Sequence, residues 1–506
     1  MRKVMEQQMV LGEIPISEIE FDLNSRDEIP KLLIGLQNLY NNNEARTQVF
    51  KILEKTIPND IDNCKGRPGM DLWKILVLGT IRLSCNCDYD KLQELANNHA
   101  KIRQMLGHGR KHSVDDGTYY ALQTLKDNLS LLTEEKLKEI NKVVVKLGHK
   151  ELKMENEDLK GRCDSFVLET NVHYPTDINL LFDAIRKIIQ LISALCSNIQ
   201  ITDWIQWAYY IRKIKKEYNK IIRLKKSTSK NEEKKAAKKK QIIDAHKKYI
   251  DLVRTYVDRA KQTIIKIKTI GLDAISEVAI LEIEKYLEHA VRQIDHIERR
   301  VIKGEKIPHN EKVFSIFEEH TEWISKGKAG VSQELGLRVC ILEDQCGFIL
   351  NHKVMQKKTD EKVTLPMVFE TKKIFPNLKS CSFDKGFYSK GNKEELEKSE
   401  EIDMVILPKK GKLSQKDKEE IDNPEYKEGR RKHSGVESAI NALENHGLDR
   451  CPDKGIERFK KYVGLAVLAR NIQIFGNIIQ QKELKRQKRR LKIKKTWEEK
   501  KLLKAA

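Results

Sequence analysis

The sequence lacks several features that would place it in a familiar class at once. It contains no run of about 18 uncharged apolar residues, which argues against a membrane span. Its first residues, MRKVMEQQMVLGEIPISEIEF, show neither the apolar segment nor the small-residue cleavage site of a secretory signal. The nine cysteines include no CxxC pair, and Cys85 and Cys87 have no matching His/Cys pair later in the chain, which disfavours a structural zinc site. We therefore expect a cytoplasmic protein without a membrane partner, whose cysteines are small core residues.

What the sequence does have is length and positive charge. Its 506 residues allow two to four domains, and a hydrophobic content of 39% is typical of a soluble globular protein. Residues 212–248 carry 16 Lys/Arg against 4 Asp/Glu, and residues 482–504 carry 12 against 3. These two excesses account for the whole net charge of +21. Two concentrated basic segments favour a polyanionic partner, most simply nucleic acid.

The first 155 residues have a helical pattern. Residues 71–83 (DLWKILVLGTIRL) predict a largely buried helix with Asp71 as its N-cap. Residues 88–109 continue with apolar residues at helical spacing and with Gly107 as a C-cap. Short helices joined by tight turns are compatible with a helix-turn-helix that binds DNA ends and with a plain helical bundle. The sequence leaves both interpretations open.

A long helical insertion follows the first strand pattern. Residues 162–177 (RCDSFVLETNVHYPTD) begin as a strand and end in a turn, after which residues 178–305 return to helical periodicity. The charged stretch KKSTSKNEEKKAAKKK predicts the tip of an antiparallel helical hairpin with its turn at residues 227–231. Its charge predicts an arm that binds DNA or a second protomer. At the other end of the chain, residues 481–506 predict a basic tail.

Strand patterns return after the insertion. Two β-rich runs in residues 334–355 flank EDQCG and predict a hairpin. Further strands are expected at residues 378–384 and 402–412, and helices at residues 364–376, 392–400, 433–449 and 459–479. With the insertion set aside, residues 156–177 and 306–480 predict a mixed α/β sheet flanked by helices.

Two aspartates lie on strands of this expected sheet. Strand alternation places Asp164 on the same face as Phe166 and Leu168, where a charge is costly unless it is paired or binds a cation. Asp384 ends the strand LKSCSFD, just before a sharp turn at Gly386. Their residue types suit metal binding at the end of a sheet. A purely structural interpretation fits equally well, in which Asp164 caps a turn and Asp384 makes an Asx turn.

A third acid is expected on the helix after His433. There Glu437 and Glu444 share a face beside an apolar stripe, and either one can point at the strand ends. Three carboxylates have a chemical use, because two Mg²⁺ ions about 4 Å apart activate a water and stabilise the leaving oxygen in attack on a phosphodiester. A solvated glutamate is the competing interpretation.

Several ordered blocks together resemble a DDE transposase of a bacterial insertion sequence, nearest to the group called ISNCY. The blocks are HTEWISKGKAG, ELGLRVCILEDQCGFILNHKV, SFDKGFYS, VILPKKGKLS and HSGVESAINALENHGLDRCPDKG, with DSFVLETNVHYPTD as the first-strand motif. The resemblance covers roughly residues 60–480. It implies a ribonuclease-H-like catalytic domain with Asp164, Asp384 and Glu437 as the three metal-binding catalytic acids.

The resemblance also implies a reaction and partners. Mg²⁺, for which Mn²⁺ can substitute, supports hydrolysis at the ends of the element, and the freed 3′-OH then attacks target DNA. The partners are double-stranded DNA, as transposon ends and target, and further copies of the chain in a dimer or larger assembly at the nucleoid. The expected phosphate contacts are Lys326, Lys328, Lys409, Lys410, Lys412, Arg430, Arg431, Lys432 and His433.

The sequence departs from the family at two positions. Some related transposases have an Arg four residues before the glutamate and a Lys seven residues after it, where this chain has His433 and Glu444. The choice of Glu437 over Glu444 therefore depends on the helix alignment. Asp177 is a rival for metal contact and also suits the N-cap of the next helix.

Two other functions compete with a transposase. The first is a catalytically inactive, transposase-derived DNA-binding protein, which acids at all three positions disfavour. The second is a helical basic RNA-binding or scaffolding protein, which leaves the strand-end acids unexplained.

Overall fold

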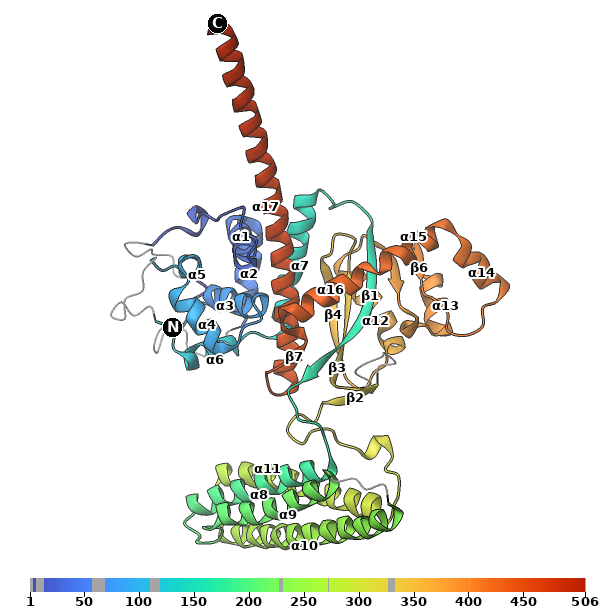
Figure 1. Cartoon of the computed structure of the whole chain (residues 1–506). Coiled ribbons are helices and arrows are strands. Elements are labelled where there is room, and N and C mark those ends of the chain that lie inside the picture. Colours follow the sequence, from blue (N-terminus) through green and yellow to red (C-terminus); the bar gives the residue numbers. More distant parts are fainter. Residues whose placement is uncertain are drawn as a thin grey trace. The chain divides into compact units, whose positions relative to one another are not determined.

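The computed structural model describes residues 3–5, 13–56, 69–109, 119–226, 231–271, 273–325, 333–399 and 401–505. The chain divides into two compact units (Figure 1). Unit 1 consists of Met1–Asn171 and Ile324–Ala506, and unit 2 consists of Val172–Trp323. Unit 1 contains the sheet, and unit 2 is helical.

A mixed sheet organises unit 1. Its main strands are β1 (Leu159–Thr170), β3 (Gln333–Glu343), β4 (Ile349–Met355), β5 (Leu378–Phe383) and β6 (Met404–Ile406), with β2 (Glu322–Ser325) and β7 (Arg450–Cys451) as short additions. β3 lies between β1 and β4 and is antiparallel to both, whereas β5 is parallel to β1 and β6 is parallel to β5. An antiparallel meander extended by parallel strands is the ribonuclease-H-like arrangement. The predicted fold class is confirmed.

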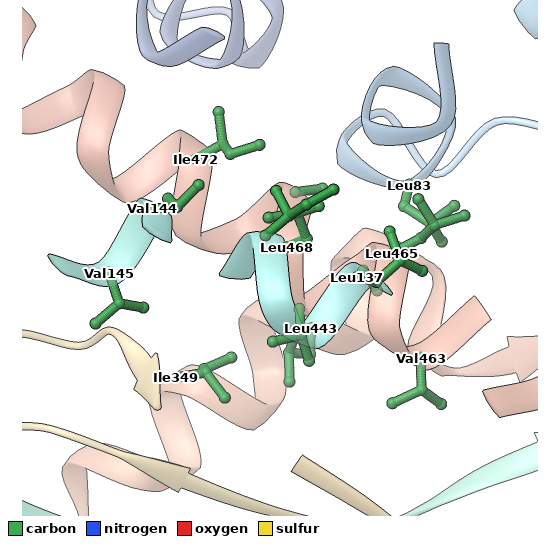
Figure 2. Close-up of a cluster of buried hydrophobic side chains, with 14 of the residues drawn as sticks. Leu83, Leu137, Val144, Val145, Ile349, Leu443, Val463, Leu465, Leu468 and Ile472 are labelled. Atoms are coloured by element: carbon green, nitrogen blue, oxygen red, sulfur yellow. The ribbon is translucent and has the colours of Figure 1, made fainter. Parts of the chain in front are cut away.

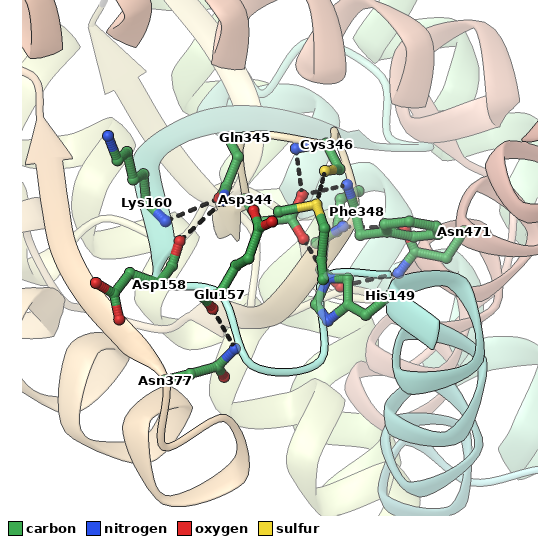
Figure 3. Close-up of polar contacts among 12 residues, drawn as sticks. His149, Glu157, Asp158, Lys160, Asp344, Gln345, Cys346, Phe348, Asn377 and Asn471 are labelled. Carbon is green, nitrogen blue, oxygen red and sulfur yellow. Dashed lines mark hydrogen bonds and ion pairs between the residues drawn. The ribbon is translucent and has the colours of Figure 1, made fainter. Parts of the chain in front are cut away.

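A buried polar network fixes the turn between β3 and β4 (Figure 3). Asp344, which has no exposed surface, accepts hydrogen bonds from the backbone N–H groups of Cys346 (2.8 Å) and Phe348 (3.0 Å). Its second oxygen lies 2.6 Å from Nε2 of His149. The predicted hairpin around EDQCG is therefore present, and a side chain from the N-terminal helices stabilises its turn.

The N-terminal helices differ from prediction in detail. They are α1 (Glu28–Asn41), α2 (Asn43–Glu54), α3 (Leu72–Ser84), α4 (Tyr89–Asn98), α5 (Ala100–Met105), α6 (Leu122–Leu129) and α7 (Glu134–Leu152). Asp71 precedes α3 as predicted, but its carboxylate pairs with Lys74 (3.0 Å) instead of capping the helix. The helix predicted over residues 88–109 is divided at His99, because the His99 ring accepts the Ile102 N–H and starts a new helix. Gly107 has a φ of 73°, as expected for the turn that ends it.

One long helix joins the N-terminal helices to the sheet. The first half of α17 (Ile456–Ala505) is buried in a cluster with α3, α7 and β4 (Figure 2). A Cβ on Gly476 would lie 1.9 Å from the carbonyl oxygen of Lys31, so α1 and α17 pack backbone to backbone. This helix holds the single window in the described residues that has the length and composition to cross a membrane, and 72% of that window is buried. The N-terminal helices and the sheet thus share one core.

The second half of α17 corresponds to the predicted basic tail. The helix continues without a break to Ala505, and the side chains from Lys485 to Lys494 are exposed. Starting a helix is the unfavourable step, and the buried half has already completed it. A lysine-rich stretch therefore extends as a helix although it has almost no apolar contacts of its own.

The second half of the sheet carries short helices: α12 (Asp360–Ile374), α13 (Lys390–Lys398), α14 (Gln415–Asp422), α15 (Pro424–His433) and α16 (Gly435–Leu443). The strand predicted over residues 402–412 covers only Met404–Ile406, because Pro408 cannot donate to a ladder. The helix predicted over residues 433–449 ends at Leu443 and continues as a π-turn, Glu444–Leu448. α14 and α15 are additional helices that the sequence pattern did not predict.

The described part of unit 2 contains four α-helices where the sequence predicted a two-helix hairpin. They are α8 (Asp177–Asn198), α9 (Trp207–Lys226), α10 (Glu232–Ile270) and α11 (Ala274–Ile297). The chain breaks at Gln200 and Trp204, which have positive φ angles, and the buried Trp204 indole donates to Thr263 (3.0 Å). A second break falls at Gly271 (φ 97°). Residues 227–230 of the predicted hairpin turn lie outside the described residues.

Candidate active site at the carboxyl ends of the parallel strands

Two predicted acids occupy matching places on adjacent strands. β1 and β5 run parallel, and Cys163 is paired with Phe383. Asp164 and Asp384 are the next residues along their respective chains. Because the strands run in the same direction, both carboxylates are placed at the same end of the sheet. The predicted neighbours of Asp164, Phe166 and Leu168, are buried.

The surroundings of Asp164 show which other acids are near. Burial raises the pKa of Asp164 to about 6, and the hydrogen bond from the Ser165 backbone N–H (2.7 Å) partly opposes this. The charges of Asp384, Asp360 and Glu437 also contribute to this raised pKa. Carboxylates from two strands and two helices therefore converge on one part of unit 1.

Asp384 is held by an arginine. Its side chain is 55% exposed, and Nη2 of Arg430, on α15, lies 3.4 Å from Oδ1. Nη1 of Arg430 donates to the carbonyl oxygen of Phe383 (3.0 Å). Arg430, predicted as a phosphate contact, thus lies directly at the end of β5. It partly neutralises the second acid.

Arg162 fixes the helix that carries Glu437. Its guanidinium pairs with Glu343 (3.0 Å) and donates to the carbonyl oxygen of Lys432 (3.3 Å), which links β1 to the end of α15. A Cβ on Gly435 would lie 2.0 Å from Nη1 of Arg162, so a side chain at the start of α16 would displace this guanidinium. Glu437 is in the first turn of α16 and is exposed.

The two glutamates of the predicted helix have different positions. Glu437 is close enough to act on Asp164, whereas Glu444 begins the π-turn after α16 and is partly buried. Arg450, which follows the π-turn, pairs with Glu169 on β1 (3.0 Å). The rival acid Asp177 belongs to unit 2, where it pairs with Arg300 (3.0 Å) and follows the N-cap Thr176.

A fourth acid, Asp360, was not predicted from the sequence. It lies in the first turn of α12, and its Oδ1 accepts a hydrogen bond from the Ser165 hydroxyl (2.7 Å). A Cβ on Gly386 would lie 3.0 Å from its Oδ2. Gly386 has no positive φ angle, so no unusual turn requires it, and a side chain there would crowd the Asp360 carboxylate. An acid at a helix start is common, and nothing in the sequence separates Asp360 from an ordinary one.

The predicted phosphate contacts fall into several groups. Lys409 pairs with Asp417 (2.7 Å), and Lys410 donates to the carbonyl oxygen of Gly386 (3.1 Å). Arg431 is exposed. His433 is buried, with Nδ1 3.0 Å from the Ser382 hydroxyl, and therefore offers no surface to DNA in this structure. The described residues do not include Lys326 and Lys328.

The residue types of the site fit a hard divalent cation. Mg²⁺ prefers carboxylate oxygens and keeps several of its waters, so a few acids suffice. As the side chains stand, no three His, Cys, Asp or Glu residues in the described part of the chain are close enough to chelate an ion together. In the same part of the chain, no Lys, Arg or His is ion-paired with Asp164, Asp360 or Glu437. The site carries an excess of negative charge that a cation would balance.

Comparison with known proteins agrees with this chemistry. Residues 298–472 match the family model described as a transposase DDE domain. The matched region includes Asp360, Asp384 and Glu437, and Asp164 lies before it on the strand beside β5. No curated protein and no solved structure matches the chain. The match supports a transposase of the DDE type, a class whose members generally use divalent metal ions and act on DNA.

Proposed function

We propose that this protein is a DNA transposase of the ISNCY-like group of bacterial insertion sequences. It binds the ends of its element, cuts them by metal-dependent phosphodiester hydrolysis and joins the 3′-OH to target DNA. The observation that carries the proposal is the placement of Asp164 and Asp384 on adjacent parallel strands, with Glu437 near Asp164. The transposase DDE match over residues 298–472 supports it independently.

Each acid has its own role in this proposal. Asp164 and Asp384 hold Mg²⁺ from the strand ends, and Glu437 completes the ligand set from the first turn of α16. When bound, two Mg²⁺ ions supply an activated water and stabilise the leaving oxygen of the cleaved strand. Arg162 and Gly435 keep α16 against β1 and thereby orient Glu437.

DNA is bound mainly through its phosphates. Arg430, Arg431, Lys409 and Lys410 lie on the segments around Asp384 and supply positive charge beside the acids. Lys326 and Lys328 remain proposed contacts, whereas His433 acts within the fold by holding Ser382. The basic segments of α9, α10 and α17 add affinity that does not depend on sequence. We further propose that the protein works as a dimer or larger assembly on DNA, in the cytoplasm at the nucleoid.

Cleavage of DNA that carries the ends of the element tests this proposal. The purified protein is incubated with a labelled duplex containing one end, with Mg²⁺, with Mn²⁺ or with a chelator. Strand cleavage that requires the cation and is lost in Asp164→Asn supports the transposase. Binding without cleavage under every cation condition would favour the inactive, transposase-derived DNA-binding protein instead.

A further inference from the structure

Asp360 connects the two strand-end acids. The backbone N–H of Ser165 donates to Asp164, and the hydroxyl of the same serine donates to Oδ1 of Asp360. The other oxygen of Asp360 lies against Gly386, two residues after Asp384. One carboxylate thus contacts a neighbour of the first acid and a neighbour of the second.

The start of α12 is fixed in this position by further contacts. The Thr364 hydroxyl donates to the carbonyl oxygen of Phe387 (3.2 Å), in the turn after Asp384. The Asn392 amide donates to the carbonyl oxygens of Glu361 (2.7 Å) and Phe387 (3.2 Å). These bonds tie the first turn of α12 to the segment that follows β5. The contact between Asp360 and Gly386 is therefore built into the fold.

The start of α12 and the Ser165 hydroxyl place partial positive charge near the carboxylate of Asp360. Thr359 is the N-cap of α12, and Asp360 follows it inside the helix. Within the described residues Asp360 has no ion-paired cation, although its charge is near enough to Asp164 to act on it. An acid kept beside other acids without a counter-ion is unfavourable unless a cation is bound there.

We propose that Asp360 is a fourth acid of the site, a positioning residue that aligns Asp164 with Asp384 and strengthens cation binding. The inference depends on the proposed function, because it concerns the same metal-binding acids. Its charge adds to the attraction for a divalent cation, and its hydrogen bond to Ser165 fixes the orientation of Asp164. Partners that orient metal ligands commonly change metal affinity by about 10- to 100-fold when they are removed.

Cation-dependent stabilisation of the full-length protein tests this role without DNA or activity. The midpoint of thermal unfolding is measured against Mn²⁺ concentration for the wild type, Asp360→Asn and Asp164→Asn. Asparagine keeps an oxygen for the Ser165 hydroxyl and removes only the charge. We expect Asp360→Asn to raise the half-saturating Mn²⁺ concentration about tenfold. Glu361→Gln, which removes an exposed acid from the same helical turn, is the matched control and leaves it unchanged.

The possible outcomes separate the two proposals. If Mn²⁺ does not stabilise the wild type, the metal-dependent function fails. Suppose instead that Mn²⁺ stabilises the wild type but not Asp164→Asn, and that Asp360→Asn has the same half-saturating Mn²⁺ concentration as the wild type. In that case only the role of Asp360 is overturned. Ser165→Ala covers the case in which Asp360→Asn does not fold, because it breaks the same hydrogen bond and keeps every charge. We expect Ser165→Ala to raise the half-saturating Mn²⁺ concentration about threefold, which corresponds to the free energy of one hydrogen bond. An unchanged concentration would contradict the inference.

Discussion

The two units differ in how their charged residues are placed. In unit 1, Asp164, Asp360 and Asp384 are fixed by strand pairing, by Ser165 and by a glycine that leaves room for a carboxylate. In unit 2, the lysines and arginines of α9 lie exposed on the outside of an apolar helical bundle. Cleavage of a phosphodiester requires catalytic groups at defined positions, whereas attraction to a DNA backbone depends on the number of positive charges. We therefore expect single substitutions to be decisive in unit 1 and only cumulative ones to matter in unit 2.

The strongest test of this contrast compares acids from the two units. Asp164→Asn and Asp384→Asn should each reduce DNA cleavage by about 10³-fold or more, because each removes a proposed metal ligand. Asp177→Asn, in unit 2, should leave cleavage within about twofold. Both effects are measured with a labelled end duplex, and binding is measured separately by mobility shift. Near-wild-type cleavage by either unit 1 variant would remove that residue from the site.

The second test distinguishes the two glutamates. Glu437→Gln should lower cation-dependent cleavage by about 10²-fold or more, since Glu437 is near Asp164. Glu444→Gln should retain at least about a third of wild-type activity, because Glu444 lies in the π-turn beyond α16. Single-turnover cleavage rates provide the comparison. The reverse result would move the third acid to the π-turn and leave the two aspartates in place.

The third test concerns the basic segments. Replacing Lys213, Lys215, Lys216 and Lys220 of α9 by glutamine should flatten the dependence of DNA affinity on salt. The log–log slope should fall by about 0.9 for every phosphate that the variant no longer neutralises. The same number of changes in the exposed end of α17, at Lys485, Lys488, Arg489 and Lys492, shows whether the two segments contribute equally. An unaltered slope in the α9 variant would mean that these lysines are solvated and do not contact DNA.

The smallest expected effect is a pH dependence of stability in unit 1. Burial, with help from Arg430, lowers the pKa of His433 to about 4. The unfolded chain therefore takes up a proton from about pH 6.5 downward before the folded one does, so the protein loses stability between about pH 6.5 and 4. The loss is at most about 1.4 kcal/mol per pH unit. His433→Gln should lose less stability than the wild type in urea unfolding at pH 7.5, 6 and 5, and His173→Gln, at an exposed site of unit 2, should lose as much as the wild type.

Much of the fold could be predicted because its signals are local. Apolar alternation or helical spacing predicted β1, the β3–β4 hairpin, β5 and α17, and the structure contains each of these elements. α14 and α15 have no apolar stripe; a capping box at Ser414 and Asp417, and Asn423 before Pro424, define where they start. The helices predicted for unit 2 were too few because the break at Trp204 depends on its burial and its bond to Thr263, which are tertiary contacts.

The candidate site could be predicted only in part from the sequence. Asp164 and Asp384 could be named because each interrupts or ends an apolar strand, and the family resemblance added Glu437. Asp360 could not be named from the sequence, since its proposed role depends on contacts with Ser165 and Gly386 that are distant in sequence. The contact of Arg430 with Asp384 and the burial of His433 are likewise products of how α15 packs on β5.

The way unit 2 is attached has a consequence for how such proteins evolve. The chain leaves unit 1 after Asn171, at the end of β1, and returns at Ile324, shortly before β3, which is the antiparallel neighbour of β1. The pairing of Glu169 with Gly336 marks the place where a short loop would close the sheet. Unit 2 therefore has the connectivity of a cassette set into a hairpin. A change in the length of the cassette at this junction would leave the strands that carry the two aspartates unchanged, and a designer can graft at the same place.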